Sequence, residues 1–258
     1  MGEGAMGKPK VRGPTHGHGM GVEGVRGGAS QDAEKERILS RSPLASLASP
    51  SRRLLFELGR VERLARRQCV CQQGAPPRHL FLIGAGRVKV ERVADGRVVP
   101  LGHRGPGELV GEGALAGAAV SSESATVLDE GHALVVPLAG LERQLASDAA
   151  LRGALAAALV ARQLETEARL GSLLLCTVEA RLIEFLRAAA RRWGQPHTAG
   201  QLVSAPFTHA DIALLIGSTR ETVTLLLGKL KRAGLIAFDR RRIVIRDGEH
   251  LEALAATA

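Results

Sequence analysis

The feature that most constrains the fold is a pair of short helical patterns joined at a glycine, in the C-terminal third of the chain. Thr208 and Asp211 have the spacing of a capping box, which predicts that a helix begins there. Gly217 predicts its end, because glycine accepts the left-handed backbone of a sharp turn. Ser218 or Thr219 then caps a second helix. Two short helices joined by a tight turn predict a helix-turn-helix.

The second helical pattern has two different faces. Its apolar face, which predicts packing on a core, carries Val223, Leu226, Leu227 and Leu230. Arg220, Glu221 and Thr224 lie on the opposite face. Arginine can donate two hydrogen bonds to guanine, and glutamate can accept one from cytosine. The pattern therefore predicts a recognition helix that contacts base edges in the major groove of double-stranded DNA.

A basic hairpin follows this helix. Apolar runs at 235–238 and 243–246 flank Asp239–Arg242, which predicts two strands with a positively charged tip, the wing. Between Gly217 and Arg246 there are eight Lys or Arg residues against two acidic ones, so the basic surplus lies where DNA phosphates need it. The expected DNA-contacting residues are Thr208, His209, Ser218, Thr219, Arg220, Glu221, Thr222, Thr224, Arg240, Arg241 and Arg242.

Short strand patterns fill residues 61–137. Runs rich in Val, Leu and Ile alternate with Gly, Pro and Asp, and Asp95-Gly96 between two such runs is a strong hairpin signal. Between 86 and 93 the alternation predicts that Val88 and Val90 point inward and Arg87 outward. Many short strands at this spacing predict a small antiparallel barrel or jelly roll, here called the β-roll.

A long helix is expected to connect the two parts. Residues 138–175 have a helical pattern, broken near Ser147-Asp148, and Thr177 predicts the cap of the next helix. A stripe with seven-residue spacing predicts a homodimer seam, although packing on the chain's own barrel also explains it. The stripe consists of Leu155, Leu159, Thr166, Leu170 and Leu173.

These patterns predict an α+β fold in four segments. They are a disordered Gly-rich tail (1–32), a β-roll domain with flanking helices (33–147), a dimerisation helix (148–176) and a winged helix-turn-helix domain (177–250).

Composition supports an intracellular DNA-binding protein. The formal net charge of +9 favours polyanions, and an aromatic content of 2% argues against binding single strands by base stacking. Three cysteines suit a reducing compartment, the N-terminus lacks the apolar run of a signal peptide, and residues 151–160 form too short a stretch to span a membrane. We therefore expect a cytoplasmic protein without a membrane partner.

The sequence from about residue 40 to 246 resembles the family of the cyclic-AMP receptor protein and the fumarate-nitrate reduction regulator (CRP/FNR family). Residues 218–223, Ser-Thr-Arg-Glu-Thr-Val, match the recognition-helix pattern of that family. The glycine framework of its β-roll is matched by Gln73-Gly74, Gly86, Asp95-Gly96, Gly105-Pro-Gly-Glu108 and Gly111-Glu112. The resemblance implies a homodimeric transcription regulator that works with RNA polymerase. It also implies base contacts by Arg220 and Glu221 and phosphate contacts by Thr208, Thr219 and Thr222.

Two positions depart from the family pattern. Leu225 replaces a common arginine, so the base preference at that step is expected to differ. In the effector pocket, Glu123 stands where cyclic-nucleotide binders have an arginine that pairs with phosphate, and a carboxylate there repels phosphate. The pocket residues that the resemblance implies are Gly111, Glu112, Ser122, Ser124 and Thr166. The cofactor stays unknown, because Glu123 argues against a cyclic nucleotide.

Two other functions fit parts of the pattern. A regulator that acts through protein partners would not need the Arg-Glu helix or the basic wing. A cupin-type metal enzyme would need several converging ligands, but the strands offer only His79, His103 and His132, far apart in sequence. Cys69 and Cys71 have the spacing of a redox or metal pair, but two inward cysteines that fill a barrel are the preferred interpretation. Cys176, at the hinge, is expected to belong to the core.

Overall fold

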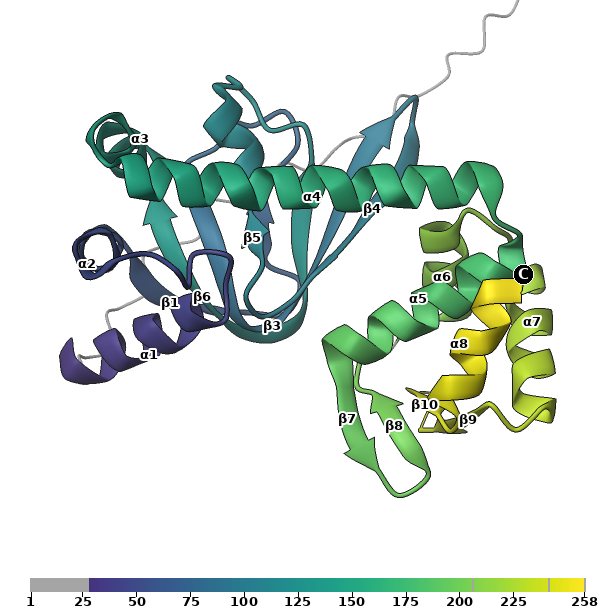
Figure 1. Cartoon of the computed structure of the whole chain (residues 1–258). Coiled ribbons are helices and arrows are strands. Elements are labelled where there is room, and N and C mark those ends of the chain that lie inside the picture. The colour runs from purple at the N-terminus through teal and green to yellow at the C-terminus, as the bar shows by residue number, and fades with distance from the viewer. Residues whose placement is uncertain (1–27, 206, 241, 258) are drawn as a thin grey trace, which may run out of the picture.

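The computed structural model describes residues 28–205, 207–240 and 242–257 and shows two packed parts joined by one long helix (Figure 1). The predicted fold class is confirmed: an antiparallel β-roll, a long helix and a helix-turn-helix with a wing. Residues 1–27 of the predicted tail lie outside the described residues. Residues 28–32, also predicted as tail, instead begin α1 (Gly28–Ser40), because they continue a helix that Ile38 and Leu39 anchor in the core.

The β-roll is built on one antiparallel sheet of six strands. The strands are β1 (Arg60–Leu64), β2 (Cys69–Cys71), β3 (His79–Ala94), β4 (Arg97–Arg104), β5 (Leu109–Val110) and β6 (Ser124–Pro137). Their order is β1-β6-β3-β4, with β2 paired to β6 and β5 paired to β3. The sequence predicts two separate strands within β3, at 79–83 and 86–93, and two within β6, at 124–128 and 133–136. Both are continuous, because register shifts near Gly86 let the paired strands bend without separating.

The predicted hairpin between β3 and β4 is confirmed. Asp95 and Gly96 have φ values of 51° and 72°, the left-handed pair that a two-residue turn between antiparallel strands requires. Val88 and Val90 are fully buried, as the alternation predicts. The expectation for Arg87 was wrong: its side chain is buried, because the C-terminal part of the chain covers that face of the sheet.

Helices flank the β-roll on its open sides. They are α2 (Ser49–Leu58), the short 3₁₀ helix η1 (Glu112–Ala116), α3 (Leu138–Ser147) and α4 (Ala149–Leu175). The break that the sequence predicts between α3 and α4 is present, and the Asp148 carboxylate accepts a hydrogen bond of 2.9 Å from the Leu151 backbone N–H. α4 lies across the β-roll and continues to the C-terminal part (Figure 1). No helix within the described ranges is long and apolar enough to cross a membrane.

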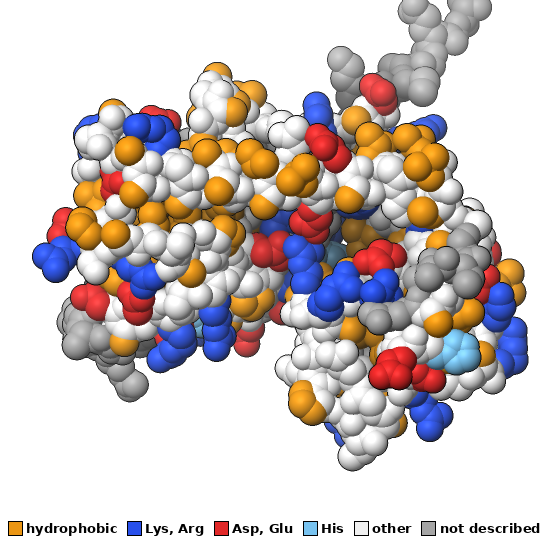
Figure 2. All heavy atoms as spheres, viewed as in Figure 1, with side chains coloured by type: hydrophobic (Ala, Val, Ile, Leu, Met, Phe, Trp, Pro, Cys, Tyr) orange, Lys and Arg blue, Asp and Glu red, His pale blue; other side chains and the backbone are white. Residues whose placement is uncertain are grey.

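The structure divides the predicted stripe on α4: Thr166 and Leu170 are exposed, whereas its other three members face their own chain. Leu155 is buried in the β-roll core, and Leu159 and Leu173 line cavities that face their own chain. Besides Leu170 of the stripe, the exposed large apolar residues of α4 are Val160, Leu164, Leu174 and Leu175. Leu164 follows Leu155 by two and a half helical turns and so points in the opposite direction. Figure 2 shows hydrophobic side chains along this outward face.

The C-terminal part has four helices and a small sheet. The elements are α5 (Val178–Trp193), β7 (Gly194–His197), β8 (Gly200–Val203), α6 (His209–Ile216), α7 (Arg220–Arg232), β9 (Ile236–Asp239), β10 (Arg242–Ile245) and α8 (Gly248–Thr257). Thr177 caps α5 by accepting a hydrogen bond of 3.1 Å from the Ala180 N–H, as predicted. The sheet order is β7-β8-β10-β9, so β7 and β8, which sequence reasoning missed, extend the sheet of the wing.

The two parts of the chain contact each other directly. Arg169 of α4 donates hydrogen bonds to the carbonyl of Leu101 on β4 (2.9 Å) and to that of Leu215 on α6 (2.8 Å). Phe207, just before α6, packs against His103 of β4 with ring centroids 5.2 Å apart, and the Arg87 guanidinium lies over its ring at 5.1 Å. These contacts hold the helix-turn-helix in one position relative to the β-roll.

Candidate DNA interface and effector site

The first helix of the helix-turn-helix begins as the sequence predicts. The Thr208 hydroxyl accepts a hydrogen bond of 3.1 Å from the Asp211 N–H, and Asp211 accepts one of 2.9 Å from the Thr208 N–H, which completes the capping box. Gly217 ends α6 with φ 63°, a conformation that a side chain would strain. Ile212 and Ile216 are buried, and Leu215 is half-buried.

The second helix, α7, presents a polar face to solvent. Thr219 caps it, with its hydroxyl 3.2 Å from the Thr222 N–H that donates to it. Its buried face is Val223, Leu227 and Leu230, with Leu226 half-buried. Arg220, Glu221, Thr224 and Leu225 are exposed. The first turn of α7 therefore carries an exposed arginine and glutamate at the positive end of the helix dipole.

Side-chain hydrogen bonds organise the polar face. The Nδ1 of His209 lies 2.8 Å from the Thr224 hydroxyl, which in turn donates to the Arg220 carbonyl at 2.8 Å. This chain of bonds ties the start of α6 to the exposed face of α7. The hydroxyls of Thr219 and Thr222 are 3.0 Å apart at the N-terminus of α7. Ser218 and Thr222 are half-buried there, beside the exposed Thr208 and Thr219.

The wing is a tight hairpin of β9 and β10. Arg242 pairs with Asp239 in its register, and Arg240 adopts a left-handed φ of 45° at the turn. Arg240 and Arg242 are exposed, whereas Arg241 lies outside the described residues. Behind the tip, Lys231 of α7 lies over the Phe238 ring at 5.9 Å, so the wing packs against the recognition helix. Of the predicted DNA-contacting residues, those that the structure describes lie at the N-termini of α6 and α7, on the exposed face of α7 and on the wing.

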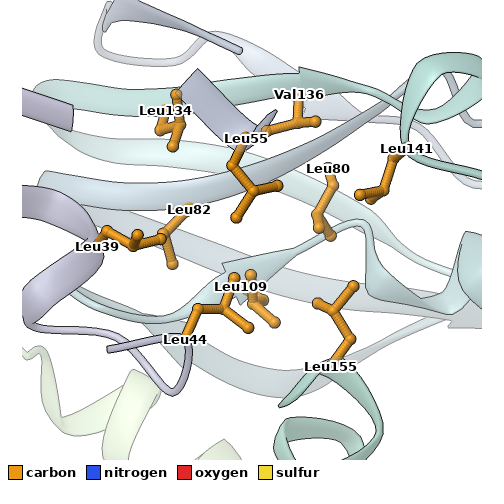
Figure 3. Close-up of a pocket in the computed structure, with 10 residues that line it drawn as sticks. All are labelled: Leu39, Leu44, Leu55, Leu80, Leu82, Leu109, Leu134, Val136, Leu141 and Leu155. Carbon is orange, nitrogen blue, oxygen red and sulfur yellow. The ribbon is translucent and has the colours of Figure 1, made fainter. Parts of the chain in front are cut away.

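The core between the flanking helices and the sheet of the β-roll offers no room for an effector. Ten apolar side chains from α1 to α4 and three strands converge on it (Figure 3). The space they leave is about 10 Å³, roughly that of one water molecule. An effector of this domain therefore has to bind outside this core.

Two of the predicted effector residues, Gly111 and Glu112, lie at a group of charged side chains. Gly111 caps η1, and Glu112 at its start is buried against Arg162 of α4, with which it forms an ion pair. Arg162 also lies 3.9 Å from Glu123. Burial raises the pKa of the Glu123 carboxyl, with the Arg104 guanidinium acting in the opposite direction. Glu123, which was predicted to repel phosphate, thus already lies beside cations of its own chain, Arg104 and Arg162.

The remaining predicted pocket residues have other partners. Ser122 is exposed, and the Ser124 hydroxyl accepts a hydrogen bond of 3.0 Å from the Gln73 N–H. Thr166 is exposed and donates to the Arg162 carbonyl of its own helix at 2.9 Å. Glu112 is therefore the one residue of the predicted set that lines the cavity beneath α4.

Sequence reasoning missed two basic residues of this site, Arg104 and Arg162. Burial, followed by repulsion from Arg104, lowers the pKa of Arg162 to about 10, so it is still a cation at neutral pH. The signal that could have found it is its spacing: Arg162 lies one helical turn before Thr166. Arg104 ends β4 with no sequence signal of its own.

A cyclic nucleotide does not fit this arrangement. The cavity lined by Arg104, Glu112 and Arg162 holds about 160 Å³, below the roughly 300 Å³ at which small-molecule sites begin. Glu112 and Glu123 border the cations that a phosphate would need. Binding would require Arg162 to leave its carboxylate partners.

The cysteines lie mostly at the surface. Cys69 and Cys176 are exposed, so the interpretation of Cys69 as barrel filling and of Cys176 as core was wrong. A register shift between Cys69 and Cys71 breaks the shared face that two-residue spacing predicts. Cys71 is half-buried, and burial raises the pKa of its thiol. Within the described part of the chain, no group of three or more His, Cys, Asp or Glu residues is placed to hold a metal ion.

Comparison with known proteins identifies both parts of the chain. A Crp-like helix-turn-helix domain matches residues 180–254, and a cyclic nucleotide-binding domain matches residues 61–148. The transcriptional regulator LdrP of Thermus thermophilus is 31% identical over 202 residues, which cover 77% of this chain and 98% of that protein. The CRP-like cAMP-activated global transcriptional regulator of Mycobacterium tuberculosis is 29% identical over 219 residues, or 84% of this chain and 97% of its own.

A solved structure agrees with these relatives. A CRP-family transcriptional regulator from Thermus thermophilus is 28% identical and superposes with a TM-score of 0.63, over 76% of this chain and 97% of its own. The helix-turn-helix and the β-roll domain thus occur in one chain, and the relatives match across both. The chain belongs to the CRP/FNR family of DNA-binding transcription regulators.

Proposed function

We propose that this regulator binds a two-fold symmetric DNA site as a homodimer, with α7 of each copy in the major groove. The observation that carries the proposal is the exposed face of α7, where Arg220, Glu221 and Thr224 project from a helix whose other face is buried. Arg220 is assigned to guanine and Glu221 to cytosine. Leu225, 72% exposed on the same face, provides an apolar contact for a thymine methyl group.

Backbone contacts position this helix. We assign phosphate contacts to the hydroxyls at the N-termini of α6 and α7 and to the cations of the wing, since both kinds of group bind phosphate without sequence preference. The residues are Thr208, His209, Ser218, Thr219, Thr222, Arg240 and Arg242, with Arg241 added from the sequence.

The homodimer uses the outward face of α4. Val160, Glu167 and Leu174 are seven residues apart, and Leu164 and Gly171 fall between them at alternating spacings of four and three. This is the repeat of a helix–helix seam, and its apolar members are more than half exposed in the single chain. Pairing this face with a second copy removes it from water and places two α7 helices on one DNA site.

Control by an effector of the β-roll domain and action through RNA polymerase complete the proposal. Both rest on membership of the family. The charged site around Arg162 is where an effector in this domain would act, because Arg162 belongs to the helix that forms the dimer. An effector that separates Arg162 from Glu112 would change the position of α4 on the β-roll.

The test is a DNA titration followed by fluorescence anisotropy. A high-affinity duplex is first selected from a random pool, and a scrambled duplex serves for comparison. Arg220→Ala is expected to weaken binding to the selected duplex by about 5- to 150-fold, the equivalent of one bidentate base contact, and to change binding to the scrambled duplex much less. Arg143→Ala removes an exposed arginine of α3 far from the interface and is the matched control. Equal losses in both variants would contradict the assignment of Arg220.

A further inference from the structure

A cavity lies between the β-roll, α4 and the DNA-binding part. Its walls come from β4, the C-terminal half of α4, α5 and the end of α6, and it holds about 360 Å³. That volume is within the range of small-molecule sites, about 300–1,000 Å³. Figure 2 shows basic and acidic side chains gathered below α4, where the two parts of the chain meet. This cavity adjoins the smaller one around Glu112, with which it shares Arg104 and Glu165 as lining residues.

Positive charge exceeds negative charge in the lining. Five arginines line the cavity, against two glutamates. Both glutamates are already paired: Glu184 lies 2.9 Å from Arg191, and Glu165 lies 3.5 Å from Arg192. The other three arginines, Arg104, Arg169 and Arg181, form no ion pair with any residue that the structure describes.

These three arginines keep donors available. Arg169 donates to the carbonyls of Leu101 and Leu215, and Arg181 donates to the carbonyl of Leu173 at 2.8 Å and of Gly217 at 3.4 Å. A guanidinium has five N–H donors, so neither is saturated by these bonds. The Nε of Arg181 is buried and has no hydrogen-bond partner, a state that costs free energy unless an acceptor arrives.

The cations are also poorly hydrated. Burial lowers the pKa of Arg104 and of Arg169 more than the nearby carboxylates raise it, so each guanidinium has lost water without forming a direct ion pair. A cation in such surroundings gains more from a counter-ion than an exposed one does. The remaining wall is apolar and includes Leu173, Phe185 and Trp193.

We propose that this cavity binds a small organic anion, with its carboxylate or phosphate group on Arg169 and Arg181 and its apolar body against Phe185 and Trp193. The polar end meets fixed donors from α4 and α5, and the apolar end replaces water on the aromatic wall. The cavity is larger than the site around Arg162. Its lining has an excess of positive charge, whereas the charges around Arg162 are balanced by carboxylates.

A ligand in this cavity touches both parts of the chain. β4 and α4 belong to one side of it, and α5 and α6 belong to the other. Binding therefore favours the position of the helix-turn-helix that the structure shows over positions that open the cavity. This consequence for DNA affinity rests on the proposed function, whereas the binding site itself does not.

The experiment is isothermal titration calorimetry of the full chain without DNA. The probes are 1-naphthoate, 1-naphthyl phosphate and the neutral 1-naphthamide. At least one of the two anions is expected to bind about tenfold more tightly than the amide, or tighter still, because one charge–charge interaction supplies about this factor. The preferred anion tells a carboxylate ligand from a phosphate ligand. Anions that bind no more tightly than the amide would overturn the proposal.

Variants locate the binding. Ala188 of α5 lines the cavity, and Ala188→Glu adds a carboxylate beside the arginines, while Ala188→Gln adds the same bulk without charge. Ala150→Glu adds the charge on an exposed turn of α4 outside the cavity. We expect Ala188→Glu to weaken anion binding about tenfold relative to Ala188→Gln, and Ala150→Glu to leave it unchanged. Equal affinities in all three variants would place the probe elsewhere and refute the site.

A second readout separates this proposal from the previous one. The DNA titration is repeated with saturating probe on the wild type and on Ala188→Glu. A changed DNA affinity in the wild type alone supports coupling through the cavity. Probe binding with unchanged DNA affinity overturns the coupling and leaves the site, whereas loss of sequence-specific DNA binding concerns only the proposed function.

Discussion

Replacing Leu164 with alanine removes an apolar side chain from the middle of the outward face of α4. In the single chain this side chain is 59% exposed, so its pairing with a second copy is available to stabilise a dimer. Fully burying a leucine is worth about 1.5–3 kcal/mol, and the exposed share of Leu164 corresponds to about 1–2 kcal/mol for each copy. Two copies in a dimer give about 2–4 kcal/mol. The substitution is therefore expected to raise the dimer Kd by a factor between about 30 and several hundred.

Sedimentation equilibrium of the full chain without DNA measures this Kd. Leu214→Ala is the matched control, because Leu214 is also a leucine on a helix, is 56% exposed and lies on α6, outside the α4 face. We expect Leu214→Ala to dimerise like the wild type. Far-ultraviolet circular dichroism checks that both variants keep their helices. Unchanged dimerisation by Leu164→Ala, or equal loss in both variants, would refute the seam.

Three further predictions test other features. Glu167→Gln should lower the dimer Kd about fivefold, because it removes a repulsion of about 1 kcal/mol between two carboxylates that meet at the seam; an unchanged or higher Kd would show that they do not meet. Burial and, to a smaller extent, the charge of Arg87 lower the pKa of His103 from 6.5 to about 4. The contribution of the neutral His103 to stability is therefore complete above pH 6.5 and is lost as the pH falls toward 4. Between pH 7 and pH 4 the wild type should therefore lose about 3 kcal/mol more unfolding free energy in denaturant titrations than His103→Gln, and parallel profiles would contradict this. Phe207→Ala should cost about 3–5 kcal/mol of unfolding free energy, since the ring is buried against Phe185, whereas Phe207→Leu should cost clearly less; equal losses would argue against ring packing.

Structural features that depend on only three or four neighbouring residues were predicted correctly. The capping box of Thr208, the turn at Gly217 and the caps at Asp148 and Thr177 are all present, because each is a hydrogen bond or backbone preference within one helical turn. The same holds for the hairpin at Asp95. These local signals were enough to predict the order of elements in the helix-turn-helix and the face of α7 that stays exposed.

Features that depend on distant segments were missed or wrong. Leu155 and Leu164 are both apolar residues of one amphipathic helix, and no local pattern says which of them meets the β-roll. Arg87 alternates with buried valines as an outward residue should, yet Phe207, far away in sequence, covers it. Strands β7 and β8 are short and polar, and their pairing with the wing makes them strands.

The candidate sites also differ in whether their residues are close together or distant in sequence. The DNA-contacting face could be proposed from the sequence, because its residues lie within one continuous segment whose spacing defines a helix and its exposed side. The ion pairs of Arg162 with Glu112 and the arginines of the cavity between the two parts could not, since they join strands and helices that are distant in sequence. The sequence by itself determined the family and the helix-turn-helix. Only the tertiary structure decided which face of α4 is free, where charge is left uncompensated and where an effector has room, because each depends on packing between distant segments.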